Sequence, residues 1–309
     1  MKKIRLALIA GGTSGEREVS LKGAVEVEKT LDPEKYSVTR YDPATDLAQI
    51  AVDAGKIDAA FILLHGLNGE DGTMQGFLEL LKIPHQGAGV LGSALAMDKN
   101  LSKTLYQLHG LPVARWEMAL VSDIDNPGRI FNSLGLPLVI KPIREGSSIG
   151  MSIVKKEDEL PAALKKAFHY DKEVMVEAFI SGREITVGVL GNDELQALPL
   201  VEIIPDGRYD FFDYEDKYKE GASREICPAE VSDAIRDKAQ QYGIEAHRAL
   251  QLRGYSRTDM IITGEDLVLL ETNTIPGMTP TSLLPRAAAA YGLNFSALLD
   301  RLIGLSLEP

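Results

Sequence analysis

Two carboxylates and an amide near the C-terminal end of the chain have the residue types and the spacing of a metal site. Asp259 and Glu271 lie in apolar runs on either side of residues 264–266 (Gly-Glu-Asp), which predict the turn of a β-hairpin. A three-residue loop at this turn places Asp259 opposite Glu271, and the alternation of strand side chains brings Asn273 to the same face. Two carboxylates that face each other repel unless a cation lies between them.

The ligand types of this hairpin indicate which cation would bind. Oxygen ligands without His or Cys suit Mg²⁺ or Mn²⁺, which also share the oxygens of substrate phosphates. Arg257 precedes Asp259 by two residues, so its side chain lies on the same face and is available to a phosphate. An exposed acidic edge of a sheet is the alternative interpretation.

A lysine and a loop of small residues in the middle of the chain predict phosphate binding. Residues 138–142 (LVIKP) are an apolar run that contains Lys141, and residues 144–151 (REGSSIGM) offer backbone N–H groups to an anion. This loop is not a Walker A motif, because the Gly-Lys pair at 55–56 is followed by Ile, and residues 11–15 do not fit G-x-G-x-x-G. A lysine at a strand end is often simply solvated, but the metal face downstream favours a role in phosphate binding.

Residues 146–150 (GSSIG) also fit G-x-S-x-G, the nucleophile elbow of serine hydrolases. That elbow requires a strand directly before the serine and a helix directly after it. Here Pro142 and four further residues separate the predicted strand from Ser147, and the residues that follow predict another strand. The histidines downstream, His169 and His247, lie in charged, helix-like stretches. The hydrolase remains a weakly supported rival.

The composition excludes several classes of protein. The chain has 309 residues, of which 45% are hydrophobic and 25% charged, as in globular proteins with two or three compact units. The net charge of -12 argues against a nucleic-acid surface. A single cysteine, Cys227, excludes an internal disulfide and a Cys-based zinc site, and its plainest interpretation is a small, partly buried side chain.

The apolar run at residues 4–10 superficially resembles a secretion signal. It is short and ends in two glycines, so a strand buried on both faces explains it better. No apolar stretch approaches the ~18 residues that are needed to cross a bilayer. We therefore expect a cytosolic protein that binds neither membranes nor nucleic acid.

The chain up to residue 95 alternates between strand and helix patterns. Each apolar run leads into a loop rich in glycine and charge, which is where open parallel sheets bind ligands. The predicted elements are strands at 4–10, 37–41 and 59–64, helices at 20–31 and 73–81, and a short strand and turn at 83–87.

Farther along the chain the pattern changes. A helix at 93–109 precedes three strands at 138–141, 151–154 and 174–177. Antiparallel strands are predicted at 184–190 and 197–203, followed by a polar, aromatic loop at 206–224 and a long helix at 231–250. The hairpin and two helices, at 281–291 and 295–304, complete the chain.

Eight blocks of sequence, in the expected order, resemble the D-alanine–D-alanine ligases of the ATP-grasp superfamily. The blocks are GGTSGEREVSL (11–21), LLHGLNGEDGTMQG (63–76), MDKNLSK (97–103), IKPIREGSSIGMS (140–152), VEAFISGREITV (176–187), FFDYEDKY (211–218), SRTDM (256–260) and ETNTIPGMTPTSLLP (271–285). This resemblance covers essentially the whole chain. It implies an α/β protein with an ATP-grasp fold and an N-terminal Rossmann-like (pre-ATP-grasp) domain.

The resemblance divides the chain into three parts. An N-terminal α/β domain (1–95) would hold the first D-alanine, and a central ATP-grasp subdomain (96–180) would grip ATP against a C-terminal subdomain (181–309). The C-terminal subdomain would also hold the metal and the second D-alanine. The family is commonly dimeric, so a homodimer is implied as well.

The same resemblance assigns residues to ATP and to two Mg²⁺ (or Mn²⁺) ions. The residues implied to contact ATP are Lys99, Lys141, Glu177, Ala178, Ile180 and Glu184. The two lysines would contact phosphates, Glu184 the ribose hydroxyls, and the other three the adenine. The family often has a lysine at position 178, so backbone groups would replace that contact here. Asp259, Glu271 and Asn273 match the family's metal ligands, in agreement with the hairpin.

The implied reaction joins two D-alanine molecules into D-alanyl-D-alanine for peptidoglycan. The carboxylate of the first D-alanine would attack the γ-phosphate of ATP, giving D-alanyl phosphate and ADP, and the amine of the second would then displace phosphate. Both steps concentrate negative charge, so positioned cations and backbone donors would carry most of the catalysis.

The residues implied to hold the amino acids or the reacting groups are Glu16, His65, Ser147, Lys217, Tyr218, Arg257, Gly277, Ser282 and Leu283. Glu16 would pair with the ammonium of the first D-alanine, supported by His65, although an acid at a helix N-terminus is the alternative interpretation of Glu16. Lys217, Ser282 and Leu283 would bind the second D-alanine. Ser147, Arg257 and the backbone of Gly277 would stabilise the developing charge.

Tyr218 bears on the choice of acceptor. It lies in a loop, residues 211–224, that is expected to close over the site and exclude water. Relatives that form the D-alanine–D-lactate ester replace this tyrosine, so its presence favours an amine acceptor; an aromatic side chain that merely packs the loop is the alternative. Acceptance of D-serine stays open. The other rivals are a different carboxylate–amine ligase with this fold and a nucleotide-binding regulator that has lost its chemistry.

Overall fold

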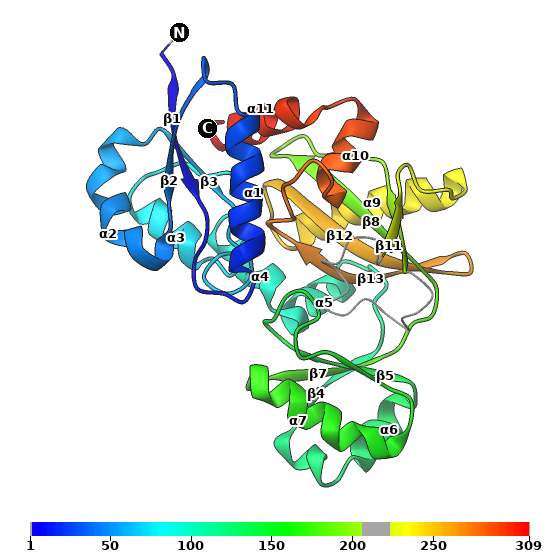
Figure 1. Ribbon diagram of the computed structural model, residues 1–309. Coiled ribbons are helices and arrows are strands. Elements are labelled where there is room, and N and C mark those ends of the chain that lie inside the picture. Colours follow the sequence, from blue (N-terminus) through cyan, green and yellow to red (C-terminus); the bar gives the residue numbers. More distant parts are fainter. Residues whose placement is uncertain (1, 206–222, 309) are drawn as a thin grey trace.

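The computed structural model describes residues 2–205 and 223–308, in which three β-sheets are covered by helices (Figure 1). One sheet comes from the start of the chain, one from the middle and one from the C-terminal half. The units built on the first and last sheets lie side by side, and the middle unit projects away from both (Figure 1). Within the described residues, no helix is long and apolar enough to cross a membrane.

The first sheet is parallel, with strand order β2-β1-β3. The central strand β1 and its neighbour β3 are largely apolar and buried, as expected for strands covered on both faces, whereas β2 is polar and largely exposed between its two tyrosines. The strands and helices of this unit are β1 (Ile4–Ile9), α1 (Arg17–Thr30), β2 (Tyr36–Tyr41), α2 (Pro43–Asp53), β3 (Ala59–Ile62) and α3 (Thr73–Leu80). Because the strands are parallel, the loops that follow β1 and β3 meet at one edge of the sheet. The strand expected at 83–87 is absent, and an isolated bridge between Ala60 and His85 stands there instead.

The middle sheet is antiparallel, with strand order β4-β7-β5-β6. Its elements are β4 (Trp116–Ala119), α6 (Gly128–Leu134), β5 (Leu138–Pro142), β6 (Ser152–Val154), α7 (Leu160–Tyr170) and β7 (Val174–Ala178). Helices α6 and α7 cover one face of this sheet and form a small core of their own with it (Figure 1). The face of this sheet that α6 and α7 do not cover is turned toward the last sheet.

The last sheet is antiparallel and runs β11-β10-β8-β12-β13, with β9 paired to β8. Its strands are β8 (Arg183–Gly191), β9 (Gln196–Ala197), β10 (Val201–Pro205), β11 (Ser223–Ile226), β12 (Gly254–Thr263) and β13 (Asp266–Asn273). The helices of this unit are α9 (Asp233–Ala249), α10 (Leu283–Tyr291) and α11 (Phe295–Ser306). The single strand expected at 197–203 is wrong: Pro199 has no N–H to donate to a ladder, and the run divides into β9 and β10.

The single helix expected at 93–109 is also wrong. The chain forms α4 (Val90–Met97) and α5 (Lys99–Leu108), with an extended residue, Asp98, between them. The Asp98 carboxylate accepts hydrogen bonds from the N–H groups of Asn100 and Leu101, so it caps α5. Both helices pack against β13, and α5 also packs against α9, so their core is shared with the last sheet.

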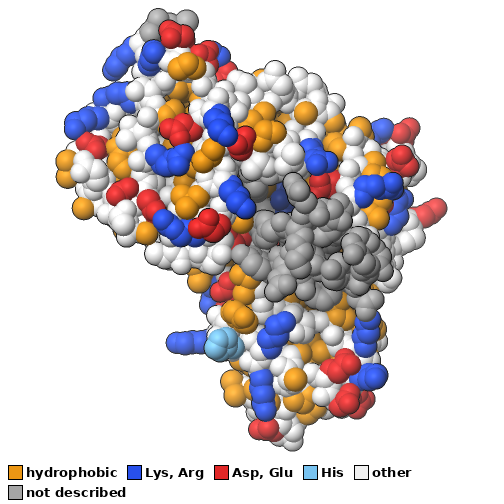
Figure 2. All heavy atoms as spheres, in the orientation of Figure 1, with side chains coloured by type: hydrophobic (Ala, Val, Ile, Leu, Met, Phe, Trp, Pro, Cys, Tyr) orange, Lys and Arg blue, Asp and Glu red, His pale blue; other side chains and the backbone are white. Residues whose placement is uncertain are grey.

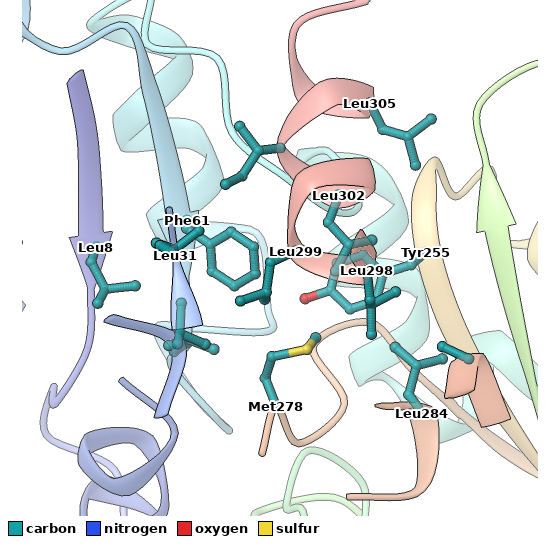
Figure 3. Close-up of a cluster of buried hydrophobic side chains, with 14 of the residues drawn as sticks. Leu8, Leu31, Phe61, Tyr255, Met278, Leu284, Leu298, Leu299, Leu302 and Leu305 are labelled. Carbon is teal, nitrogen blue, oxygen red and sulfur yellow. The ribbon is translucent and has the colours of Figure 1, made fainter. Parts of the chain in front are cut away.

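The first and last units share one hydrophobic core (Figure 3). Leu299 of α11 lies beside Phe61 of β3, and Met278 and Tyr255 belong to the same cluster. All of these side chains are at most 2% exposed. On the face shown in Figure 2, acidic and basic side chains are intermixed across the described residues of these two units.

The β12–β13 hairpin contains two departures from its expected register that cancel. The turn has two residues, Gly264 and Glu265, because Thr263 pairs with Asp266, so the predicted three-residue loop is wrong. A β-bulge then follows: Met260 pairs with Leu269 but Asp259 pairs with Glu271. The pairing of Asp259 with Glu271 is therefore as predicted, although the route to it is different.

Candidate active site

A cavity of about 170 Å³, here called the central cavity, lies between the middle sheet and the last sheet. Its walls come from β5 and β7 on one side, from β8, β12 and β13 on the other, and from the loop between β5 and β6. The residues expected at the site that line it are Lys99, Lys141, Ser147, Glu177, Ala178, Ile180, Glu184, Asp259 and Glu271. Segments far apart in the sequence thus converge on one space.

Much of the wall is apolar. The apolar side chains that sequence reasoning did not assign to the site are Val139, Ile149, Met151, Ile153, Phe179, Ile261 and Leu270. Leu270 faces the cavity together with its neighbour Glu271 because of the bulge, which interrupts the strict alternation of β13. Such an apolar slot with a few polar groups at its ends suits a flat aromatic ring attached to a charged tail.

Asp259 is the centre of a hydrogen-bonded cluster on β12 and its neighbours. The Arg257 guanidinium donates to both oxygens of this carboxylate, at 3.0 Å each. Asn273 Nδ2 donates at 3.1 Å and Thr186 Oγ1 at 2.5 Å. Burial disfavours the charge on Arg257, but the Asp259 carboxylate outweighs this effect and raises the pKa of Arg257. The arginine therefore stays charged, with its charge beside the cavity.

Glu271 lies opposite Asp259 and close to a lysine of α5. Lys99 Nζ is 3.9 Å from Glu271 Oε2, and it donates at 2.6 Å to the carbonyl oxygen of Glu145 in the loop after β5. Burial lowers the pKa of Lys99, and Glu271 opposes that shift. Across the described ranges, no group of three or more His, Cys, Asp or Glu side chains is placed to hold a metal. A cation in this region would depend on two carboxylates and the Asn273 amide.

Glu177 is held between two lysines. Lys141 Nζ lies 2.5 Å from one of its oxygens, and Lys103 of α5 donates to the other. Glu177 is 3% exposed and Lys103 is 0% exposed, so the three charges share a nearly dry environment. Burial opposes the ionised form of Glu177, but Lys141 and then Lys103 outweigh it and lower its pKa.

The loop between β5 and β6 joins the middle unit to the first unit. Ser147 Oγ donates a hydrogen bond to Glu16, which immediately precedes α1. The Glu16 side chain makes no capping hydrogen bond to α1, but it does lie at the N-terminus of that helix, as the macrodipole interpretation also requires. Ser147 and Ser148 both have positive φ, +49° and +61°, in a turn that the Ile149 N–H closes by donating to the Gly146 carbonyl oxygen at 3.0 Å.

His65 follows β3 and lines a second cavity of about 370 Å³ at the edge of the first sheet. It is 8% exposed, and burial lowers its pKa while the nearby Glu16 carboxylate opposes that shift. Glu70, in the same loop, accepts from the N–H of Gly66 at 2.9 Å and from the N–H of Ile275 at 3.2 Å. This loop is therefore tied to the segment that follows β13.

Gly277, Ser282 and Leu283 lie in or just after that segment. Ser282 Oγ hydrogen-bonds Thr279 Oγ1 at 2.8 Å and accepts from the Thr279 N–H at 3.2 Å. A Cβ at position 277 would lie 3.1 Å from Ser282 Oγ, so a glycine keeps this turn tight and its backbone accessible. Leu283 is the first residue of α10. Lys217 and Tyr218, together with residues 211–222 of the expected closing loop, lie outside the described residues.

The serine hydrolase interpretation does not fit this geometry. β5 ends at Pro142, four residues separate it from Ser147, and the next element is strand β6 rather than a helix. The Ser147 hydroxyl donates to a carboxylate, not to a histidine. His169 lies on α7 beside Tyr170, and His247 bonds Ser256 within the last unit, so neither is a partner of Ser147.

Besides the apolar wall residues, which include Leu270, sequence reasoning missed two charged side chains near the site, Lys103 and Glu70. Lys103 had a usable signal, because it lies four residues after Lys99 and so on the same helical face. Glu70 lies within the 63–76 block but has no distinctive spacing. Leu270 had no usable signal in the sequence, because the pattern of residue types does not show where a β-bulge will occur.

Comparison with known proteins identifies the family. A model described as the D-ala D-ala ligase C-terminus matches residues 105–304, and one described as the D-ala D-ala ligase N-terminus matches residues 44–88. The chain belongs to the D-alanine–D-alanine ligase family. A D-alanine–D-alanine ligase of Desulfotalea psychrophila is 61% identical over 310 residues, which span 99% of this chain and 96% of that protein.

Solved structures of the ligase family have the same fold. The VanG D-Ala:D-Ser ligase of Enterococcus faecalis matches with a TM-score of 0.86 and 34% identity, over 99% of this chain and 100% of its own. The D-alanine–D-alanine ligase of Bacillus anthracis complexed with ATP matches with a TM-score of 0.83 and 32% identity, over 98% of this chain and 97% of that chain. The fold class, α/β of the ATP-grasp type, is therefore as expected.

Proposed function

We propose that this protein joins two D-alanine molecules into D-alanyl-D-alanine at the expense of ATP, releasing ADP and phosphate. One observation carries the proposal: a single cavity gathers two lysines, the glycine- and serine-rich 146–150 loop and the Asp259–Glu271 pair. This is the set of groups that phosphoryl transfer to a carboxylate requires. Family membership and an ATP complex of a relative support the same conclusion.

ATP would lie along the central cavity. Its adenine would fit the apolar end near Ala178 and Ile180, at the end of β7, and Glu184 would receive the ribose hydroxyls. Lys141 and Lys99 would face the phosphates, together with the backbone of the 146–150 loop. Burial opposes the charge on Lys141, but Glu177 raises its pKa, so this lysine is a cation at neutral pH.

The residues present also fit the two Mg²⁺ (or Mn²⁺) ions that the family implies. Asp259, Glu271 and Asn273 supply hard oxygen donors from neighbouring strands, and Asp259 is nearly buried while Glu271 is partly open to the cavity. Bound there, such ions would neutralise the negative charge of the phosphates. The Arg257–Asp259 pair holds the carboxylate in one orientation before any ligand arrives.

In the first step, a carboxylate oxygen of D-alanine forms a bond to the γ-phosphorus as the bond to the β–γ bridging oxygen breaks. ADP leaves and D-alanyl phosphate remains. Glu16 would bind the ammonium of this D-alanine, with Ser147 fixing the Glu16 carboxylate and His65 beside it. Arg257 and the Gly277 N–H would face the negative charge that develops on the transferred group.

In the second step, the amine of another D-alanine attacks the carbonyl carbon of the acyl phosphate. The peptide bond forms, the carbon–oxygen bond to phosphate breaks, and the amine loses a proton. Ser282 and Leu283 would line this acceptor's subsite, with Lys217 at its carboxylate. Tyr218 in the sequence favours an amine over a hydroxyl acceptor, which supports a dipeptide product for peptidoglycan synthesis in the cytoplasm.

The test is phosphate release from ATP and Mg²⁺ with D-alanine, L-alanine, D-lactate or D-serine as the added substrate. We expect release with D-alanine alone, and none with L-alanine. D-serine mixed with D-alanine measures how far the acceptor subsite discriminates, which matters because a D-Ala:D-Ser ligase has the same fold. Release with L-alanine but not D-alanine would contradict the proposed substrate.

We also propose that the protein is a homodimer, as the family resemblance implies. Several large apolar side chains of α3, α4 and α5 are exposed in the single chain, among them Leu80, Leu91 and Leu108. If they gather into one apolar patch, a second copy would cover it. Light scattering on a sizing column would distinguish a dimer of about twice the 33.6 kDa chain mass from a monomer.

A further inference from the structure

We propose that Lys103 is a positioning residue of the nucleotide site: its ammonium holds the Glu177 carboxylate so that the central cavity selects a purine with an amino group at position 6. This inference rests on the proposed function, since it concerns the nucleotide of the same reaction. Lys103 itself does not line the cavity, so it would act through Glu177.

The geometry makes Lys103 an unusual lysine. Its side chain is 0% exposed, which is rare for lysine unless the charge is paired. The Lys103 ammonium donates to one Glu177 oxygen, while Lys141 occupies the other at 2.5 Å. The same ammonium lies 5.7 Å from the ring centre of Trp116. Trp116 Nε1 in turn donates at 2.9 Å to Asn100, so the neighbourhood is fixed on several sides.

Two lysines on one carboxylate decide what Glu177 can offer to a ligand. Together they lower its pKa despite burial, so the carboxylate is ionised and can only accept hydrogen bonds. An ionised carboxylate has more acceptor positions than the two lysines use. The remaining positions suit the 6-amino group of adenine, a donor, and repel the 6-keto oxygen of guanine. A protonated carboxyl would lose that distinction, because it could donate to the keto group.

Lys103 also joins two units of the molecule. Helix α5 packs with β13 and α9 of the last unit, whereas Glu177 belongs to β7 of the middle unit. Lys99 and Lys103 lie one turn apart on α5, a spacing at which like charges repel. The repulsion is relieved because Lys99 faces Glu271 and Lys103 faces Glu177. One helix face therefore sets both the phosphate end and the base end of the cavity.

The experiment compares ATP with GTP in phosphate-release kinetics with D-alanine, for the wild type, Lys103→Met, Glu177→Gln and the double variant. For Lys103→Met we expect the KM for ATP to rise about tenfold and the ATP-over-GTP ratio of kcat/KM to fall by about the same factor. The KM for D-alanine should change by less than about twofold. Because Lys103 acts through Glu177, adding Lys103→Met to Glu177→Gln should change the ratio by less than about twofold.

Controls separate this role from a purely structural one. Lys165→Met removes an exposed lysine of α7 and should behave as the wild type. Lys103→Arg keeps the charge and should retain the ATP-over-GTP ratio even if its larger side chain lowers stability. Binding of ADP and GDP, followed by the fluorescence of Trp116, the only tryptophan in the sequence, gives the same ratio for variants with slow turnover.

Three results would overturn the proposal. The first is an unchanged ATP-over-GTP ratio in Lys103→Met, and the second is that Lys103→Met lowers this ratio as much in the Glu177→Gln background as in the wild type. The third is that Lys103→Met raises the KM for D-alanine as much as the KM for ATP. A failure of the proposed function looks different, because the wild type itself would then release no phosphate with D-alanine.

Discussion

The first and last units of this molecule supply candidate functional groups in opposite ways. In the first unit, Glu16 and His65 lie in loops that follow parallel strands β1 and β3. In the last unit, Arg257, Asp259 and Glu271 lie within antiparallel strands β12 and β13. Groups within strands are positioned by ladder register, whereas groups in loops are positioned by whatever their loops contact.

The contacts of each set illustrate the difference. Asp259 is held by Arg257, Asn273 and Thr186, all within its own sheet. Glu16 instead accepts from Ser147, which belongs to the middle unit. The strand-borne groups are therefore in place before any substrate binds, and the loop-borne groups depend on how the units are arranged. Substitutions in the two sets should differ in size and in which kinetic constant they change.

The largest effect is expected from Asp259→Asn. The change keeps the shape of the side chain but removes the charge that Arg257 pairs with and that a cation would need. We expect kcat for phosphate release to fall about a thousandfold, with the circular dichroism spectrum unchanged. Asp266→Asn, an exposed acid directly after the turn of the same hairpin, is the matched control and should stay within about twofold of the wild type.

Ser147→Ala tests the loop-borne set and should have a smaller effect. It removes the hydroxyl that fixes Glu16, so the first D-alanine should bind in more than one orientation. We expect kcat/KM for D-alanine to fall about thirtyfold while the KM for ATP changes by less than about threefold. A fall in kcat as large as that of Asp259→Asn, or a change confined to the KM for ATP, would remove the distinction between the strand-borne and the loop-borne groups.

Leu270→Ala tests the bulge that places an apolar side chain in the cavity. Loss of this contact with the base should raise the KM for ATP about fivefold and leave kcat nearly unchanged. Val268, on the same strand, does not line the cavity, so Val268→Ala should leave the KM for ATP at the wild-type value. Equal effects of the two substitutions would show that the bulge has no part in binding.

The remaining prediction concerns stability and pH rather than kinetics. Burial raises the pKa of Glu70 to about 8, so the folded protein keeps a proton that the unfolded chain releases above its ordinary value of 4.5. The stability that this group contributes is therefore present at low pH and declines as the pH rises from about 5 to about 8. Relative to Glu70→Gln, the wild type should lose roughly 1 kcal/mol for each pH unit in this window, or a few degrees of Tm per unit. A wild type that gains stability over the same window would contradict the assignment.

The sequence predicted most of the elements of the last unit, and the reason is physical. The side-chain period in strands is short, so the even spacing of Arg257 and Asp259, and of Glu271 and Asn273, places each pair on one face whatever the turn does. The facing of Asp259 and Glu271 was predicted from a three-residue turn, however, and it arises from a two-residue turn and a bulge. Two errors of one residue cancelled.

Other features were not predictable because they depend on tertiary partners. The break at Asp98 has a local signal, an N-cap residue, but the apolar pattern continues across it. The burial of Lys103 against Glu177 requires α5 to lie over the middle sheet, which no local pattern encodes. The hydrogen bond between Glu16 and Ser147 spans 131 positions of the chain, and only the family resemblance brought the two together.

The most direct test of the central claim is anomalous diffraction from crystals grown with Mn²⁺ and a non-hydrolysable ATP analogue. The account predicts manganese peaks within roughly 2.3 Å of oxygens of Asp259, Glu271 and Asn273, bridged to the analogue's phosphates. Manganese bound elsewhere, with these three side chains turned away from the nucleotide, would contradict it.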